Sequence, residues 1–129
     1  MRLKQNRLKV YHHRTAIPKK NNEGGSYVEY AQAVDFKAEE WPAGGKIQSE
    51  RYGIRLPNIR NIRIEGRFKE VMTENKALGF AVENGPTFTV DDGICLHVPG
   101  DSAPDYRIIA VYPYRFLTLE VEKIYWQTE

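Results

Sequence analysis

The stretch at residues 105–123, DYRIIAVYPYRFLTLEVEK, contains two runs in which apolar and polar side chains alternate. Apolar side chains occupy every second position of the two runs, at Tyr106, Ile108 and Ala110 and then at Leu117, Leu119 and Val121. A side-chain period of two is that of a β-strand, so each run has one apolar face. The stretch is therefore predicted to be a β-hairpin that serves as scaffold and forms part of a mainly β fold.

The segment YPYR at 112–115 sets the predicted register of this hairpin. Pro113 fixes φ at about −65°, which excludes the mirror-image two-residue turns and favours a four-residue loop built on a type I turn. With that loop, Arg107 lies opposite Glu120 as a cross-strand ion pair. Pro113 is thus predicted to be a structural turn residue.

Length and composition describe one soluble globular domain that spans residues 1–129. Of the 129 residues, 41% are hydrophobic and 28% are charged. No run approaches the roughly 18 apolar residues of a membrane-spanning helix, and the N-terminus lacks the apolar stretch of a signal peptide. The single cysteine, Cys95, excludes an internal disulfide. We therefore expect a protein of the cytoplasm with no membrane partner.

The net charge of +2 conceals an asymmetry. Residues 1–20 hold seven Lys/Arg and no acid, whereas the rest of the chain holds twelve Lys/Arg against seventeen Asp/Glu. A basic segment on an acidic body can attract nucleic acid or an acidic protein. The alternative is an edge strand whose lysines discourage aggregation.

The rest of the chain shows further short alternating runs separated by turn signals. They lie near residues 8–10, 28–30, 34–38, 62–68, 80–82, 88–90 and 94–98. Residues 18–25 have the composition of a loop, and 70–77 fit a short helix or a loop. The chain is therefore predicted to be a small antiparallel β-barrel or sandwich of about six to eight strands, with at most one or two short helices. A long irregular insert is expected at about 39–58.

The apolar positions on either side of Asp91-Asp92-Gly93 distinguish two possible lengths of the turn there. A two-residue turn would pair Val90 with Cys95, whereas a three-residue loop at 91–93 pairs Val90 with Ile94 and aligns the apolar faces. Such a loop places a residue in the left-handed region just before the returning strand, where glycine costs least. Gly93 is therefore predicted to have a positive φ.

Cys95 and His97 are the pair that most resembles a catalytic constellation, because histidine can activate a thiolate. Positions i and i+2 of a strand are about 7 Å apart, however, which is too far for a direct hydrogen bond. His12 and His13 point to opposite faces of a regular strand and cannot chelate one metal together. Asp101 and Asp105 fit loop formation better than paired catalysis. The sequence predicts no catalytic residue, cofactor or metal site.

A nucleic-acid-binding β-barrel is the alternative function that the sequence supports. Small barrels bind single strands by stacking bases on aromatic side chains beside a cationic groove. The middle of the chain supplies Tyr52, Arg55, Arg60, Arg63 and Arg67 for such a groove. Interleaved acidic residues at 50, 65 and 70 weaken this case.

Four blocks of the sequence, in their order, resemble a known family. They are RLKVYHHR (7–14), VDFKAEEWP (34–42), IRNIRIEGRF (59–68) and GDSAPDYRIIAVYPYRFLTLEVEKI (100–124). This order is similar to that of the small head–tail connector proteins of tailed phages, of the head-closure or stopper type. Within that group it is most similar to the XkdH-type of PBSX-like defective prophages. The resemblance covers nearly the whole chain and is carried by packing and turn patterns.

The resemblance implies a ring of small β-barrels around the DNA channel, between a portal–adaptor complex and the tail. The implied partners are those neighbouring rings and other copies of the chain, with non-specific proximity to double-stranded DNA. The implied location is the bacterial cytoplasm and then the virion neck. Family members carry a long loop that reaches the channel axis, and its best match is the insert at 39–58. Its candidate residues are Glu39, Glu40, Gly44, Gly45, Lys46, Glu50, Arg51 and Gly53.

Overall fold

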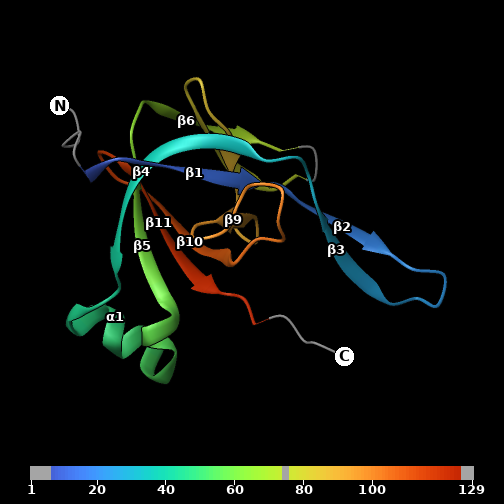
Figure 1. Ribbon diagram of the computed structural model, residues 1–129, viewed down its shortest axis with the longest axis horizontal. Helices are drawn as coiled ribbons and strands as arrows, with labels where there is room; N and C mark the ends of the chain where they lie inside the picture. The colour runs from blue at the N-terminus through green and yellow to red at the C-terminus, as the bar shows by residue number, and fades with distance from the viewer. Residues whose placement is uncertain (1–6, 74–75, 126–129) are drawn as a thin grey trace.

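The computed structural model describes residues 7–73 and 76–125 and shows a closed antiparallel β-barrel (Figure 1). Six strands follow one another around it in the order β1-β4-β5-β11-β10-β9. Their bounds are Lys9–Arg14 (β1), Val34–Pro42 (β4), Ile59–Ile64 (β5), Leu117–Lys123 (β11), Tyr106–Pro113 (β10) and Gly93–Cys95 (β9). The prediction of a mainly β fold with an antiparallel barrel is confirmed.

Three further elements are attached to the barrel (Figure 1). The arm is a two-stranded ribbon that projects away from it, and the cap is a helical segment beside β4 and β5. The third element, the side sheet, has three strands. Their bounds are Ala16–Lys20 (β2) and Ser26–Tyr30 (β3) for the arm, Gly45–Tyr52 (α1) and Gly53–Asn58 (η2) for the cap, and Phe68–Met72 (β6), Leu78–Val82 (β7) and Thr87–Phe88 (β8) for the side sheet.

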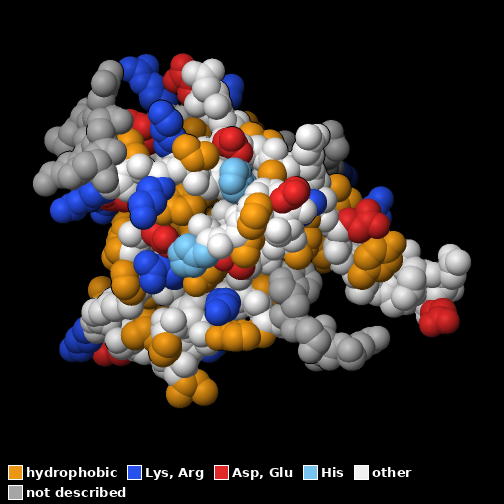
Figure 2. All heavy atoms as spheres, viewed as in Figure 1, with side chains coloured by type: hydrophobic (Ala, Val, Ile, Leu, Met, Phe, Trp, Pro, Cys, Tyr) orange, Lys and Arg blue, Asp and Glu red, His pale blue; other side chains and the backbone are white. Residues whose placement is uncertain are grey.

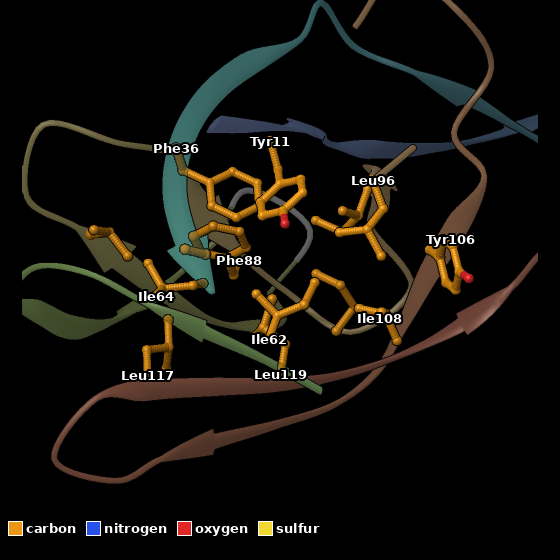
Figure 3. Close-up of a cluster of buried hydrophobic side chains, with 14 of the residues drawn as sticks. Tyr11, Phe36, Ile62, Ile64, Phe88, Leu96, Tyr106, Ile108, Leu117 and Leu119 are labelled. Carbon is orange, nitrogen blue, oxygen red and sulfur yellow. The ribbon is translucent and has the colours of Figure 1, made fainter. Parts of the chain in front are cut away.

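The core fills the barrel with side chains from alternate positions of its strands (Figure 3). Ile62, Ile108 and Leu119 are fully buried, as the period of two predicts. Each such side chain contributes about 1.5–3 kcal/mol through removal of apolar surface from water. Phe88 enters this core from the side sheet and contacts the Phe36 ring edge to face, with 5.0 Å between ring centroids. The side sheet is therefore joined to the barrel by apolar packing.

The β10–β11 hairpin forms, but its predicted register is wrong. Pro113 is the last residue of β10 and pairs with Leu117, so residues 114–116 form the loop. At the end of a strand the missing proline N–H costs no ladder bond, which removes the need for the four-residue turn. Pro113 is thus a strand-end residue.

A register shift between Ile108 and Ala110 further changes the partners in this hairpin. Such a β-bulge adds one residue to one strand and leaves it unpaired. As a result Arg107 lies opposite Glu122, with 3.6 Å between its Nη2 and the carboxylate Oε1. The predicted pairing of Arg107 with Glu120 is wrong because the three-residue loop moves the register by three positions, of which the bulge restores one.

The predicted turn before β9 is also wrong. Gly93 does not have a positive φ, and Asp91 takes the left-handed conformation at φ +79°. Aspartate tolerates this region better than most residues, because its short side chain bonds locally. The pairing of Val90 with Ile94 is absent, since β8 pairs with β7 while β9 pairs with β1 and β10.

Gly93 is required by close packing instead of by its backbone angle. A Cβ atom at this position would lie 2.4 Å from Cγ and 2.7 Å from Cβ of the buried Pro104. Such distances lie far inside van der Waals contact. The glycine therefore allows the loop around Pro104 to cover the strand that closes the barrel.

Two segments that the sequence predicted to be loops are strands. Residues 18–20 belong to β2, and the expected helix or loop at 70–77 begins as β6. The β2 strand was not predicted because it contains lysine and proline, which are uncommon in strands. Most of β2 is exposed, so it has no stripe of buried apolar side chains.

We expect Gly93→Ala to lower the free energy of unfolding by about 1–3 kcal/mol, because Pro104 and the strand must move apart. Gly44→Ala is the matched control, since no atom lies within 4 Å of its added Cβ and its φ of −171° suits any residue. Urea unfolding followed by circular dichroism measures both. Equal stability of the two variants would contradict the packing role of Gly93.

Candidate interaction surfaces

The predicted irregular conformation of the insert at 39–58 is wrong, because residues 39–42 belong to β4 and residues 45–58 form the cap. Two of the candidate channel residues lie in β4, and the others lie in or next to the cap. Glu39 and Glu40 belong to β4, Gly44 precedes α1, Gly45, Lys46, Glu50 and Arg51 belong to α1, and Gly53 begins η2. Gly45 and Gly53 have φ values of +82° and +56°, which a residue with a side chain rarely adopts.

The cap has no buried residue, which explains why no apolar stripe revealed it. A helix normally packs on its core through such a stripe. Ile47 and Ile54 instead face solvent, with 71% and 97% of their surface exposed. The cap is therefore attached to the barrel by polar contacts and leaves two large apolar side chains outside.

Glu120 on β11 is the residue that holds the cap. Its carboxylate is 2% exposed and accepts hydrogen bonds from both the cap and β10. The donors are Gln48 Nε2 at 2.6 Å, Arg51 Nη1 at 3.2 Å, Tyr52 hydroxyl at 2.8 Å and Tyr112 hydroxyl at 2.6 Å. A hydrogen bond to a charged group contributes about 1.5–3 kcal/mol, so this cluster can replace apolar packing. The alternating pattern predicted Glu120 only as the cross-strand partner of Arg107 and did not identify this cluster.

The cluster favours the charged form of Glu120. Burial alone would raise the pKa of its carboxyl, but the bonds from Tyr112, Gln48 and Tyr52 hold that pKa below its ordinary value. Burial and the bond to this carboxylate raise the pKa of the Tyr112 hydroxyl. Tyr112 therefore stays a donor and Glu120 stays an acceptor over a wide pH range.

The arm is anchored at its base by Arg14 and Asp92. The Arg14 guanidinium donates to the carbonyl oxygens of Ala31 at 2.7 Å, Tyr30 at 3.0 Å and Ser102 at 2.7 Å. The buried Asp92 accepts from the Ala16 amide at 3.0 Å. These bonds satisfy the backbone where the arm leaves the barrel and fix its direction.

His12 and His13 lie on opposite faces of β1, as predicted. His12 is within 2.6 Å of the Asp35 carboxylate near the surface, whereas His13 is buried 2.7 Å from Asp92. The two rings therefore cannot share a ligand. Within the described residues, no three His, Cys, Asp or Glu side chains gather closely enough to hold a metal ion.

Cys95 and His97 do not form a reactive pair. The Cys95 thiol is buried 3.7 Å from the Ser102 carbonyl, and burial raises its pKa, which disfavours a thiolate. His97 contacts Glu40 at 2.9 Å instead. Asp105 accepts hydrogen bonds from the amides of Leu96 and His97, so it is a loop-forming residue.

The arginines proposed for nucleic-acid binding are largely engaged with carboxylates. The pairs are Arg55 with Glu122 at 2.7 Å, Arg60 with Glu40 at 2.9 Å and Arg63 with Glu39 at 3.0 Å. Figure 2 shows basic, acidic and hydrophobic side chains interspersed on the face it presents. Pairing removes much of the charge that would attract phosphates. It also offsets the charge of Glu39 and Glu40, two of the candidate channel residues.

Comparisons with models of protein families, with curated proteins and with solved structures find no match for this chain. None of the helices within residues 7–73 and 76–125 has the length and apolar content to cross a bilayer.

We expect Glu120→Gln to lower the free energy of unfolding by about 1.5–3 kcal/mol at neutral pH, because charge-assisted bonds are lost. The folded protein lowers the pKa of this carboxyl, so its stabilisation is complete above the unfolded value of about 4.3 and disappears as pH falls through the folded pKa. The difference between wild type and variant should therefore narrow on acidification.

Urea unfolding at a series of pH values measures this difference. Glu50→Gln is the control, because Glu50 is an exposed glutamate of the same helix. A difference that stays constant or widens as pH falls would show that the charge of Glu120 does not hold the cap.

Proposed function

We propose that this chain is a non-enzymatic structural component of a phage or prophage head–tail connector. In this role it forms part of a ring around the DNA channel, between the portal–adaptor complex and the tail. Its partners are those neighbouring rings and other copies of itself, and its final location is the virion neck. The proposal rests on the order of the four sequence blocks and on the fold that they form.

The observation that carries the proposal is a closed barrel with a projecting arm (Figure 1). A ring subunit needs a rigid body and an extension that reaches the next subunit. The barrel supplies the body, because every one of its strands is paired on both sides. The arm supplies the extension, and Arg14 and Asp92 fix its base.

The cap and the arm are the two candidate segments for contact with neighbouring subunits. The cap, which includes most of the candidate channel residues, is tied to the barrel through Glu120. In the two strands of the arm, seven of the ten residues are exposed. We therefore assign the contact with neighbouring subunits to the arm, and we keep the outer face of the cap, with Ile47 and Ile54, as the candidate surface toward an adjacent ring or the channel.

A surface groove of about 1110 Å³ does not favour an enzyme. Its wall combines apolar rings such as Phe68 and Phe116 with Lys37, Arg67 and Glu83 from separate segments. Charges of both signs are spread along this wall, whereas a catalytic site brings a nucleophile and a base within hydrogen-bond reach. The arrangement suits a surface that another protein covers.

The proposal predicts that the purified chain adds a ring to the portal–adaptor complex encoded in the same genome. Electron microscopy of the mixture should show extra density on that complex. A variant in which Asn-Gly replaces residues 19–27 should keep the circular dichroism of the barrel and fail to form the ring, because the arm is shortened. Genes for a portal and a major capsid protein upstream, and for a tail tube downstream, identify the complex to use.

Failure of the intact chain to bind an intact portal–adaptor complex would contradict the proposal. Binding of single-stranded DNA that falls steeply with salt, and falls again in Arg63→Ala, would favour nucleic-acid binding instead.

A further inference from the structure

Outside the barrel, the described residues form two small sheets whose edge strands are paired on one side alone. Each barrel strand, by contrast, has a neighbouring strand on both sides, because the strand order closes on itself. In the side sheet, β7 is central, and β6 and the two-residue β8 are the edges. In the arm, β2 and β3 pair with each other and with no further strand. An unpaired edge is a template for strand addition, and β6 is the longer edge of the side sheet.

In an antiparallel ladder, pairs of residues that exchange backbone hydrogen bonds alternate with pairs that do not, and this parity shows which backbone groups of the arm point outward. The Ala31 amide donates to the Thr15 carbonyl, so the ladder bonds of the arm join odd-numbered residues. The groups of Ser26 and Val28 on β3 therefore point away from β2. On the other edge the outward position is Pro18, which has no N–H. Strand addition to the arm is thus directed to β3.

The same reasoning applies to β6. The Glu83 amide donates to the Arg67 carbonyl and the Thr73 amide to the Ala77 carbonyl, so odd-numbered residues of β6 carry the ladder with β7. The N–H and C=O groups of Glu70 and Met72 therefore point away from the side sheet. Both free edges offer their even-numbered residues, at the same spacing.

We propose that β3 of one copy of this chain adds antiparallel to β6 of a second copy. In the register that the parity allows, Val28 pairs with Glu70 and Ser26 pairs with Met72 through backbone hydrogen bonds. The intervening pairs, which lack such bonds, are Glu29 with Lys69 and Tyr27 with Val71. The Tyr30 carbonyl already accepts from Arg14, so the shared ladder extends from Val28 toward Ser26.

Charge and exposure favour this partner. Glu29 and Lys69 are both exposed, and they meet directly across the strands, where opposite charges stabilise a pair. Tyr27, Val28 and Met72 are exposed to 45%, 50% and 69%, and the added strand covers them. One contact thus pairs free backbone groups, joins two charges and buries exposed apolar surface.

Symmetric alternatives fit less well. A two-fold pairing of β6 with β6 in the register that pairs the whole strand would place Glu70 opposite Glu70, where like charges repel. A two-fold pairing of β3 with β3 would leave Lys69 and Met72 uncovered. The contact between β3 and β6 uses two different surfaces, so it can continue from copy to copy and close into a ring. In that respect the inference rests on the proposed function, although the strand contact itself does not.

Disulfide trapping tests the register. Glu29→Cys and Lys69→Cys are made on separate chains that also carry Cys95→Ser, and the two proteins are mixed at high concentration under mild oxidation. Residues 29 and 69 occupy a pair without backbone bonds, where the Cβ atoms lie closest and a disulfide can form. We expect the mixed dimer to accumulate several-fold over the controls, on denaturing gels and by mass spectrometry.

Matched controls move one cysteine off the edge. Lys19→Cys lies on β2 of the same arm, and Glu83→Cys lies in the turn after β7, so each is exposed but outside the proposed ladder. Pairing of Lys19→Cys with Lys69→Cys, or of Glu29→Cys with Glu83→Cys, should trap poorly. A second trap pairs Tyr27→Cys with Val71→Cys. The yield of this disulfide should fall when Lys69→Glu is added to the Val71→Cys chain, and it should recover when Glu29→Lys is also added to the Tyr27→Cys chain.

The same trap is applied to isolated protein and to rings formed on the portal–adaptor complex. Excess of the 29–69 dimer in either sample supports the inference. Trapping no better than the controls in both samples, or predominance of the 29–29 dimer, overturns it. Rings that form without a 29–69 disulfide would support the connector function and contradict the strand contact. A 29–69 disulfide in a chain that forms no rings would support the strand contact and contradict the connector function.

Discussion

The three-residue strand β9 closes the barrel, and the rest of the structure depends on that closure. Gly93–Cys95 pairs with β1 on one side and with β10 on the other. So short a strand supplies few ladder bonds, and Asp92 and Asp105 support it from both ends by accepting backbone amides. Closure gives every barrel strand a neighbour on both sides, so among the described strands those with a neighbour on one side alone lie in the arm and the side sheet.

Two different kinds of force attach the appendages to this barrel. The side sheet is joined through apolar contact, since Phe88 is buried among the barrel side chains. The cap is joined through polar contacts, because none of its side chains is buried. The buried Glu120 carboxylate accepts most of them, and Gln48 with Asn61 and Arg55 with Glu122 add to them. An attachment of the second kind depends on bond geometry and charge more than on area. It lets Ile47 and Ile54 stay exposed without loss of the cap.

The sequence predicts the strands of the core because their period of two reflects local geometry. Ile108, Leu119 and Val121 were placed correctly for that reason. The details that failed depend on tertiary structure. Nothing local marks the bulge after Ile108, and the need for Gly93 comes from Pro104, eleven positions later.

Most of the cap and the first strand of the arm were missed for a related physical reason. Pattern analysis detects an element by the apolar face that it buries, and neither element buries one. The same limit applies to Glu120, whose role depends on donors from positions 48, 51, 52 and 112. Candidate surfaces of this kind become visible only when the fold places distant polar residues together.

The arm is the element least supported by its own molecule. An isolated two-stranded ribbon is marginally stable in water, because it has few cross-strand contacts and no hydrophobic face to bury. Arg14 and Asp92 secure its base, but its distal half has no such anchor among the described residues. Backbone pairing with another surface orders the distal half of such a ribbon. The conformational entropy lost in that step is reduced, because the base of the ribbon is already ordered. A projecting arm of this design is therefore suited to contact with another subunit.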